Sequence, residues 1–271
     1  MVVHVTRHRG GFPLGWTSIT TLDEAEDNSG IALGVWKVEA EGKASRLLER
    51  ETAFLLMDGV VKAKVGEEER TLRRSSLFDE GPSCVHASRG ETVTFTAETA
   101  FEMTVFQVDN DRAFRTRIYT PEDVDDERRG AGVVGDASLR LVRTLFDGSN
   151  TPDEARLVLG EVLTLPGRWS SYPPHHHPQP ELYHYRFTHP QGYGHAELGD
   201  DVVKVRQYDT MKIFSPHTHA QVAAPGYGMY YSWVIRHLDD ARYGVPTFDD
   251  EHDWARREGA PLWSPKWAGP R

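Results

Sequence analysis

The chain has 271 residues, which is enough for one large β domain or two domains of ordinary size. It carries 31 Lys and Arg against 41 Asp and Glu, a formal net charge of −10, and no basic run long enough to form a patch, which argues against nucleic acid and anionic membranes as partners. Cys84 is the only cysteine, and the first residues contain no apolar stretch of signal-peptide length. We therefore expect a protein of a reducing, cytoplasmic compartment, without a membrane segment.

Predicted β-strands dominate the first half of the chain. Short segments rich in Val, Phe, Tyr and Thr are separated by Gly, Pro and Asp turns, which is typical of a β-sandwich or barrel. Lys62 and Lys64 alternate with apolar residues, as a half-buried strand requires. The clearest strands are predicted at residues 53–57, 60–65, 92–97 and 101–108. This pattern predicts an all-β chain.

A charged segment rich in Gly and Asp, residues 120–137, follows these strands. It contains the best helix signal of the chain, at 121–128, where Thr120 can act as the N-cap and Pro121 takes the first helical position. Strand-like sequence resumes at 139–146. The segment is therefore predicted to link two parts of the chain.

The two sides of this linker follow a similar order. On each side an apolar stretch leads into a Pro-containing turn with a His, and a further β segment follows, at 77–95 and again at 211–233. Such a repeat of pattern indicates a weak internal duplication. We predict two jelly-roll-like β-barrels, an N-terminal one over 1–128 and a C-terminal one over 129–271, with their junction near 120–138.

Residue types that bind metals gather in the second half. His175 and His177 are two residues apart, so in extended backbone their imidazoles point to the same side and can reach one ion. A Pro-Gln-Pro turn then leads to Glu181 at the start of a predicted strand. A fourth ligand has to come from a later strand, where His217 and His219 share one face by the period-2 rule. The pattern predicts one metal site.

The remaining histidines are not expected to bind the ion. His176 and His184 are predicted to lie at the surface or beside the site, and His86 stands alone, so the N-terminal barrel is expected to hold no metal. Imidazole and carboxylate ligands suit a divalent transition metal, of which we expect one per chain, Zn first, with Mn, Fe, Co and Ni as alternatives. The absence of thiolate ligands favours an open site that admits a substrate oxygen.

At these residues the sequence resembles the 5-deoxy-glucuronate isomerase family of inositol catabolism, which is related to 5-keto-4-deoxyuronate isomerase and belongs to the cupins. The similar segments are 170–177, 181–187, 190–194 and 219–231, with 121–124, Glu127, Arg129 and Gly130 between the predicted barrels. The sequence Ala-Ala-Pro-Gly-Tyr at 223–227, followed by Tyr230 and Tyr231, is more specific than a general cupin motif. The chain departs from the family at His176 and Pro178, which leaves the predicted ligands intact.

The resemblance implies a bicupin that acts as a metal-dependent aldose–ketose isomerase. Such an enzyme is an intramolecular oxidoreductase, which moves a carbonyl between adjacent carbons of a uronic acid. The implied reaction converts 5-deoxy-glucuronate to 2-deoxy-5-keto-gluconate. The implied metal ligands are His175, His177, Glu181 and His219. Candidates for proton transfer near the metal are Glu181, Tyr231 and Tyr185. Candidates for binding the substrate carboxylate, because a guanidinium offers a bidentate fork, are Arg168, Arg186 and Arg206.

Two other functions would use the same ligands. An Fe(II) cupin dioxygenase would require bound iron and would consume O₂. A non-catalytic, metal-stabilised sugar-binding cupin would do no chemistry, and the sequence contains no helix-turn-helix or other effector domain to accompany it. In each case the expected partner is a small molecule, an anionic sugar acid for the isomerase, and homo-oligomerisation stays open.

Overall fold

The computed structural model describes residues 3–268, and β-strands form nearly all of its regular structure. One sheet of nine strands comes from the N-terminal half: β2 (Gly15–Thr20), β3 (Ala32–Val38), β4 (Lys43–Leu47), β5 (Glu51–Val65), β6 (Glu68–Arg74), β7 (Cys84–Ala87), β8 (Thr92–Ala97), β9 (Phe101–Val108) and β10 (Arg117–Tyr119). Helical structure in residues 3–268 is confined to four short 3₁₀ turns, so the all-β prediction is confirmed. None of the helices among these residues is long and apolar enough to cross a membrane.

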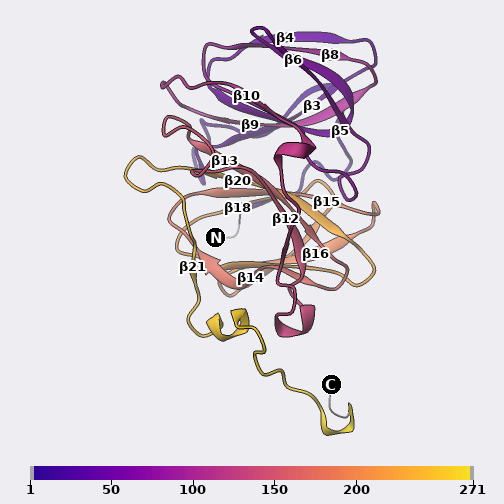
Figure 1. Ribbon diagram of the computed structural model, residues 1–271, viewed down its shortest axis with the longest axis vertical. Coiled ribbons are helices and arrows are strands. Elements are labelled where there is room, and N and C mark those ends of the chain that lie inside the picture. Colours follow the sequence, from indigo (N-terminus) through magenta and orange to yellow (C-terminus); the bar gives the residue numbers. More distant parts are fainter. Residues whose placement is uncertain (1–2, 269–271) are drawn as a thin grey trace.

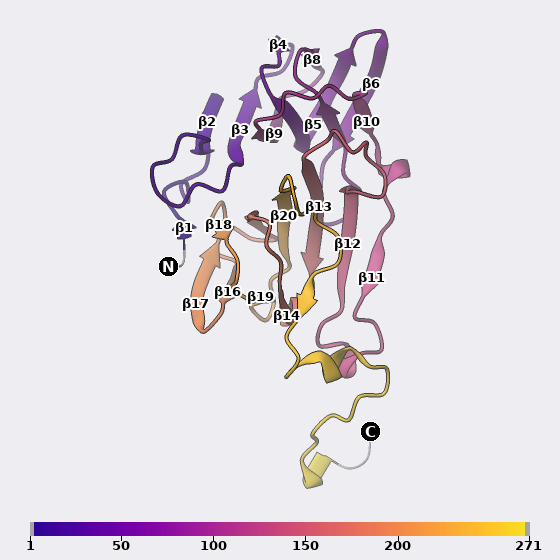
Figure 2. The same ribbon diagram turned by 90° about the vertical axis from the view of Figure 1, so that its left-hand side faces the viewer.

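Two further sheets come mainly from the C-terminal half. Their strands are β11 (Glu127–Arg129), β12 (Arg140–Phe146), β13 (Leu157–Thr164), β14 (Trp169–His176), β15 (Glu181–Phe187), β16 (Tyr193–Leu198), β17 (Asp201–Arg206), β18 (Thr210–Ile213), β19 (His219–Ala223), β20 (Met229–Arg236) and β21 (Thr247–Phe248). The first sheet also includes β1 (Val3–Val5) and has the order β1-β18-β15-β20-β13-β12-β11, and the second has the order β17-β16-β19-β14-β21. In Figure 1 the two sheets lie face to face below the N-terminal half, and Figure 2 shows the same stack turned by 90°.

The start of the chain belongs to the C-terminal half. Strand β1 (Val3–Val5) pairs antiparallel with β18. Next to it, the Asp209 carboxylate accepts hydrogen bonds from His4 Nε2 at 2.7 Å and from Arg9 Nε at 2.7 Å. The predicted division at residue 128 stays a prediction, and β1 and β11 both lie in the seven-stranded sheet.

The predicted helix at 121–128 is wrong. The capping contacts form, since Thr120 N donates to Asp123 Oδ2 at 2.9 Å, but the helix is a single 3₁₀ turn, η1 (Pro121–Asp123). A second such turn, η2 (Val134–Asp136), follows in the same segment. The chain leaves the helical path because residues 127–129 pair with β12 as strand β11.

Alternation along the strands divides the core into three clusters. In β5, Leu55 packs into a cluster shared by both halves, whereas Phe54 and Leu56 pack inside the N-terminal half. In β13, Leu159 joins the shared cluster and Val158 packs inside the C-terminal half. This period-2 pattern means that the nine-stranded and seven-stranded sheets bury their facing sides against each other.

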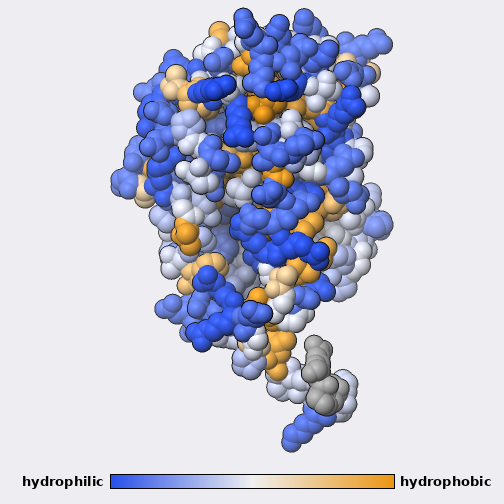
Figure 3. Space-filling model, in the orientation of Figure 1, coloured by the Kyte–Doolittle hydropathy of each residue, from blue (hydrophilic) through white to orange (hydrophobic). Residues whose placement is uncertain are grey.

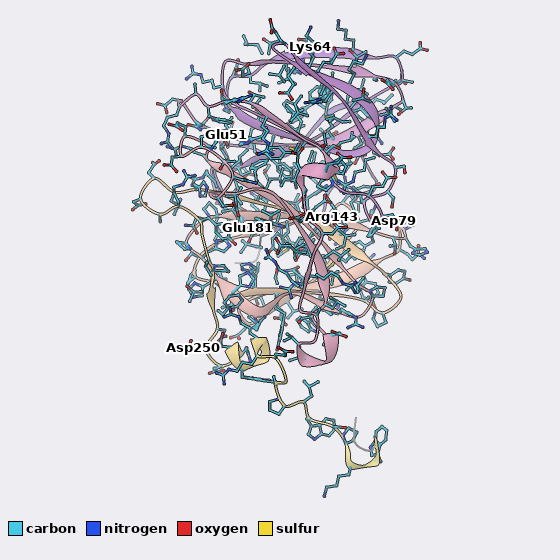
Figure 4. All side chains as sticks on the ribbon, in the orientation of Figure 1. Glu51, Lys64, Asp79, Arg143, Glu181 and Asp250 are labelled. Atoms are coloured by element: carbon cyan, nitrogen blue, oxygen red, sulfur yellow. The ribbon has the colours of Figure 1, made fainter. Side chains whose placement is uncertain are left out.

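A buried ion network crosses the same junction. The Glu161 carboxylate accepts hydrogen bonds from Arg74 Nη2 at 2.6 Å, from Arg143 Nη1 at 3.1 Å and from the Tyr230 hydroxyl at 2.9 Å. The side chains of Glu161 and Arg74 have no exposed surface. Arg143, labelled in Figure 4, lies near this junction, while the face of the molecule seen in Figure 3 is mostly hydrophilic. The network fixes β6, β12, β13 and β20 relative to one another.

Candidate metal centre

A distortion in β14 sets up the candidate metal centre. The pairing of β14 with β19 shifts between Ser170, which lies opposite Gln221, and His175, which lies opposite His219. Pro173 and Pro174 fall within this shift, and proline lacks the N–H that a regular ladder requires. Residues directly opposite each other in an antiparallel pair project to the same side, so the rings of His175 and His219 lie 4.5 Å apart between centroids.

Three side chains bring their ligand atoms together at this place. Glu181 opens β15, His219 opens β19, and His177 follows the end of β14. One nitrogen or oxygen atom from each of the three lies within 4.8 Å of the others, and all three residues are buried. Glu181 Oε2 is 3.2 Å from His177 Nε2 and 3.4 Å from His219 Nε2. Figure 4 shows Glu181 among the strands of the C-terminal half.

The chemistry of these atoms fits a metal ion. His177 Nδ1 donates to the Gln179 carbonyl oxygen at 2.9 Å, so a lone pair on Nε2 faces the Glu181 carboxylate. Both ring nitrogens of His219 are buried without a hydrogen-bond partner among residues 3–268. Ligands bound at about 2.0–2.1 Å around a tetrahedral ion lie roughly 3.3–3.4 Å apart, which matches the two distances from Glu181. A cation among the three groups would satisfy all of them.

The other histidines take different positions. His175 lies beside the cluster, and its Nδ1 donates to the Pro173 carbonyl oxygen at 3.1 Å, but it is not among the three residues whose ligand atoms converge. His217 is exposed, whereas His219 is buried, which favours His219 over its neighbour. His184 is buried away from the cluster, where Nδ1 bonds with the Thr210 hydroxyl at 2.8 Å.

Burial controls the charge of the cluster. It lowers the pKa of His175 to about 4 and lowers the pKa of His219 well below its ordinary value. It also raises the pKa of the Glu181 carboxyl. The two imidazoles are therefore neutral near pH 7, which is the form that binds metals.

A cavity of about 370 Å³ adjoins the cluster. Its walls come from the facing sheets of the C-terminal half and from the segment after β20. The lining side chains include Arg129, Arg140, Val142, Thr144, Asp147, Val162, Ser171, His175, His177, Glu181, Tyr183, Tyr231, Trp233, Tyr243, Phe248 and Arg256. A space of this size, with charged and aromatic walls, suits a small polar ligand.

Two tyrosines face the cavity together. The Tyr231 and Tyr183 hydroxyls each lie 3.1 Å from Ser171 Oγ, and the two rings are 4.5 Å apart between centroids. Burial raises the pKa of Tyr231 to about 12, so its hydroxyl keeps its proton near pH 7. Tyr185, predicted from the sequence, lies outside the lining and donates to Gln221 Oε1 at 2.6 Å. Tyr183, two residues earlier on the same strand face, was missed, although alternation from Glu181 indicates it.

The arginines predicted to bind a substrate do not line the cavity. Arg168 donates to the Asp136 carbonyl oxygen, and Arg206 is exposed. Arg186 pairs with Glu102 at 2.7 Å, which joins the two halves. The structure brings three other arginines to the cavity: Arg129, Arg140 and Arg256. Local sequence pattern did not indicate these three, because β11, β12 and η3 (Asp253–Arg256) come together only through long-range packing.

Comparison with known proteins identifies the family of the chain. A family model described as the KduI/IolB family matches residues 15–255. The chain is 27% identical over 224 residues to a 5-deoxy-glucuronate isomerase of Geobacillus kaustophilus, covering 76% of this chain and 78% of that protein. It is 28% identical over 223 residues to a 5-deoxy-glucuronate isomerase of Shouchella clausii, covering 75% and 79%.

Solved structures show the same fold. An IolB-like protein from Salmonella typhimurium LT2 matches with a TM-score of 0.77 and 24% identity, covering 91% of this chain and 97% of that one. A cupin 2 conserved barrel domain protein from Leptotrichia buccalis matches with a TM-score of 0.52 and 9% identity, covering 86% and 96%. The family resemblance seen in the sequence is thereby confirmed, and the chain belongs to the KduI/IolB family.

Proposed function

We propose that this protein is a bicupin isomerase of a uronic acid, which converts 5-deoxy-glucuronate to 2-deoxy-5-keto-gluconate as a step of inositol catabolism. The observation that carries the proposal is the convergence of His177, Glu181 and His219 at a cavity lined by arginines. Membership of the KduI/IolB family and the names of the curated relatives support the same reaction.

The ligand set proposed for the metal is His177, Glu181 and His219, with His175 beside them as the fourth. Zinc is the first candidate, because three imidazoles and one carboxylate without thiolates suit it, although Mn, Fe, Co and Ni accept the same donors. When bound, a divalent ion supplies Lewis-acid stabilisation of the negative charge that develops on substrate oxygens.

The side chains around the cluster supply the other requirements of an isomerase. Moving a carbonyl to the neighbouring carbon requires a proton to leave one carbon and reach the next, and protons to be exchanged at the two oxygens. Tyr231 keeps its proton near pH 7, so it is suited to donate a hydrogen bond to a substrate oxygen. Ser170 and Ser171 each lie 3.1 Å from its hydroxyl and hold it in place. Glu181 is the candidate to exchange the carbon-bound proton.

Aromatic side chains form part of the cavity wall. They are Trp233, Tyr243 and Phe248, and they offer apolar surface to the carbon skeleton of a sugar acid. The hydroxyls of Tyr183 and Tyr231, which are outside the proposed ligand set, are the polar groups suited to orient the substrate.

Anaerobic turnover tests this function directly. The purified protein, reconstituted with Zn²⁺, is incubated with 5-deoxy-glucuronate without O₂, and the product is followed by NMR. We expect the substrate to convert to 2-deoxy-5-keto-gluconate, and we expect the His219→Ala variant to be inactive. Turnover that requires O₂ and iron would identify an oxygenase instead, and the absence of any turnover would contradict the isomerase.

A further inference from the structure

The three arginines of the cavity differ in how their charges are balanced. Arg129 Nε lies 2.8 Å from Glu127, and Arg256 Nη1 lies 2.8 Å from Asp253, so both have a carboxylate partner. Arg140 has no ion pair with any group in residues 3–268. Its recorded hydrogen bond runs from Nη1 to the Ser138 carbonyl oxygen at 2.9 Å, and its buried Nε has no partner within the same range.

The unpaired guanidinium of Arg140 belongs to the cavity wall. Arg140, Val142 and Thr144 alternate along β12, and all three line the cavity, so the guanidinium shares the cavity face of the strand. Burial and the nearby Arg129 both oppose its positive charge. A buried charge without a partner is costly, and such groups persist where a ligand completes them.

The carboxylates that line the cavity are already engaged. Glu181 lies in the three-residue cluster, at 3.2 Å from His177 Nε2. Asp147 Oδ1 accepts hydrogen bonds from the backbone N–H and the hydroxyl of Ser149, at 2.8 Å and 2.6 Å. Neither acid forms an ion pair with Arg140 in the part of the chain that the structure describes, so the missing anion has to come from outside the protein.

We propose that the guanidinium of Arg140 binds the carboxylate of the sugar-acid substrate. This inference rests on the proposed function and adds an orientation to it. With the carboxylate at Arg140, the polyhydroxyl part of the substrate extends along Tyr231 towards the cluster of His177, Glu181 and His219. A neutral sugar leaves the guanidinium unpaired, so the site selects acids over neutral sugars.

Ligand binding separates this role from a merely structural one. The probes are D-glucuronate and D-glucuronamide, which have the same sugar ring and differ by the charge at one carbon. Affinities are measured by calorimetry on the Zn²⁺-loaded protein and on its Arg140→Gln, Arg140→Lys and Arg206→Gln variants. Arg206 is exposed outside the cavity and serves as the matched control. Thermal unfolding of each variant verifies that it is folded.

We expect the unsubstituted protein to prefer glucuronate over glucuronamide by roughly 10- to 100-fold, as a charged bidentate contact provides. The Arg140→Gln variant should lose this preference while keeping its affinity for glucuronamide. Arg140→Lys should recover part of it, and Arg206→Gln should retain all of it. The proposal is overturned if the unsubstituted protein does not prefer glucuronate, if Arg140→Gln still does, or if Arg206→Gln loses the preference.

The outcome is distinguishable from failure of the proposed function. A protein that isomerises 5-deoxy-glucuronate but keeps its preference in Arg140→Gln contradicts only the role of Arg140. A protein that loses its preference in Arg140→Gln but turns over no 5-deoxy-glucuronate contradicts only the isomerase.

Discussion

The Glu161→Gln substitution tests how firmly the two halves are joined. Glu161 has no exposed side-chain surface, and it accepts hydrogen bonds from Arg74, Arg143 and Tyr230. Glutamine has nearly the same shape, so the substitution removes the negative charge without opening a cavity. It leaves the Arg74 guanidinium, which has no other carboxylate partner among residues 3–268, buried and uncompensated.

The expected loss follows from that uncompensated charge. Removing one partner of a buried ion pair typically costs about 3–5 kcal/mol. Arg143 keeps its contact with Asp126, and Arg74 keeps hydrogen bonds to the carbonyl oxygens of Leu56 and Glu80. We therefore expect the loss of stability to lie near the lower end of this range. A loss of about 3 kcal/mol corresponds to a fall in melting temperature of roughly 6–12 °C for a chain of this size.

Chemical denaturation followed by circular dichroism measures the loss. The control is Asp109→Asn, which breaks the Arg50–Asp109 pair, with a separation of 2.6 Å but with 41% and 75% of the two side chains exposed. An exposed pair of this kind contributes about 0–1 kcal/mol. If Glu161→Gln lowers the free energy of unfolding by no more than Asp109→Asn does, the reasoning about the buried network is wrong.

Three further predictions concern the metal centre, the contacts of Asp209 with the start of the chain, and the cavity wall. Elemental analysis should find close to one transition metal per chain, which is lost in His219→Ala but kept in His217→Ala. Loss in the His217 variant alone would mean that His217, and not His219, is the ligand. Burial opposes ionisation of Asp209, but hydrogen bonds from His4 and Arg9 outweigh it, so the pKa of this carboxyl is lowered. The carboxylate therefore stabilises the folded protein fully above the pKa of about 3.9 that Asp has in the unfolded chain, and this stabilisation is lost as the pH falls further. Unfolding measured from pH 7 to pH 2 should therefore show a deficit in Asp209→Asn that shrinks below pH 4, and a deficit independent of pH would contradict this origin. A Cβ at Gly160 would lie 2.3 Å from the Trp233 ring, so Gly160→Ala should displace this cavity residue. We expect the free energy of unfolding to fall by about 1–3 kcal/mol and turnover to be lower. Unchanged denaturation and kinetics would mean that Trp233 moves aside without cost.

Local pattern was enough to predict several of the strands. The predicted segments 92–97 and 101–108 coincide with β8 and β9. The two segments 53–57 and 60–65 are one strand, β5, because Gly59 adopts φ +105 and its missing Cβ leaves room for the Ala100 carbonyl oxygen. Alternation finds apolar faces, but it cannot show that a strand continues through an irregular position.

The candidate site also contains residues that local sequence indicates and residues that only long-range pairing brings together. His177 and Glu181 are four residues apart, so their approach is a local property of one turn, and the sequence pattern indicates it directly. The cavity arginines come from β11, β12 and η3, which meet only after long-range pairing. The sequence pattern does indicate that Arg140 shares one face of a strand with Val142 and Thr144. It does not indicate that this face lines the cavity, because that depends on which sheet covers it.

Aromatic side chains fill much of the interior of the N-terminal half. Trp36, Phe54, Phe95 and Phe101 pack together there, with neighbouring ring centroids 5.0–6.4 Å apart. The side of the nine-stranded sheet that faces the C-terminal half packs on β13 and β20. In each of these strands one residue joins the buried network and the next one lines the cavity: Glu161 precedes Val162, and Tyr230 precedes Tyr231. Packing at the junction therefore fixes the register of the strands that form the cavity wall, and in this way the N-terminal half supports the site.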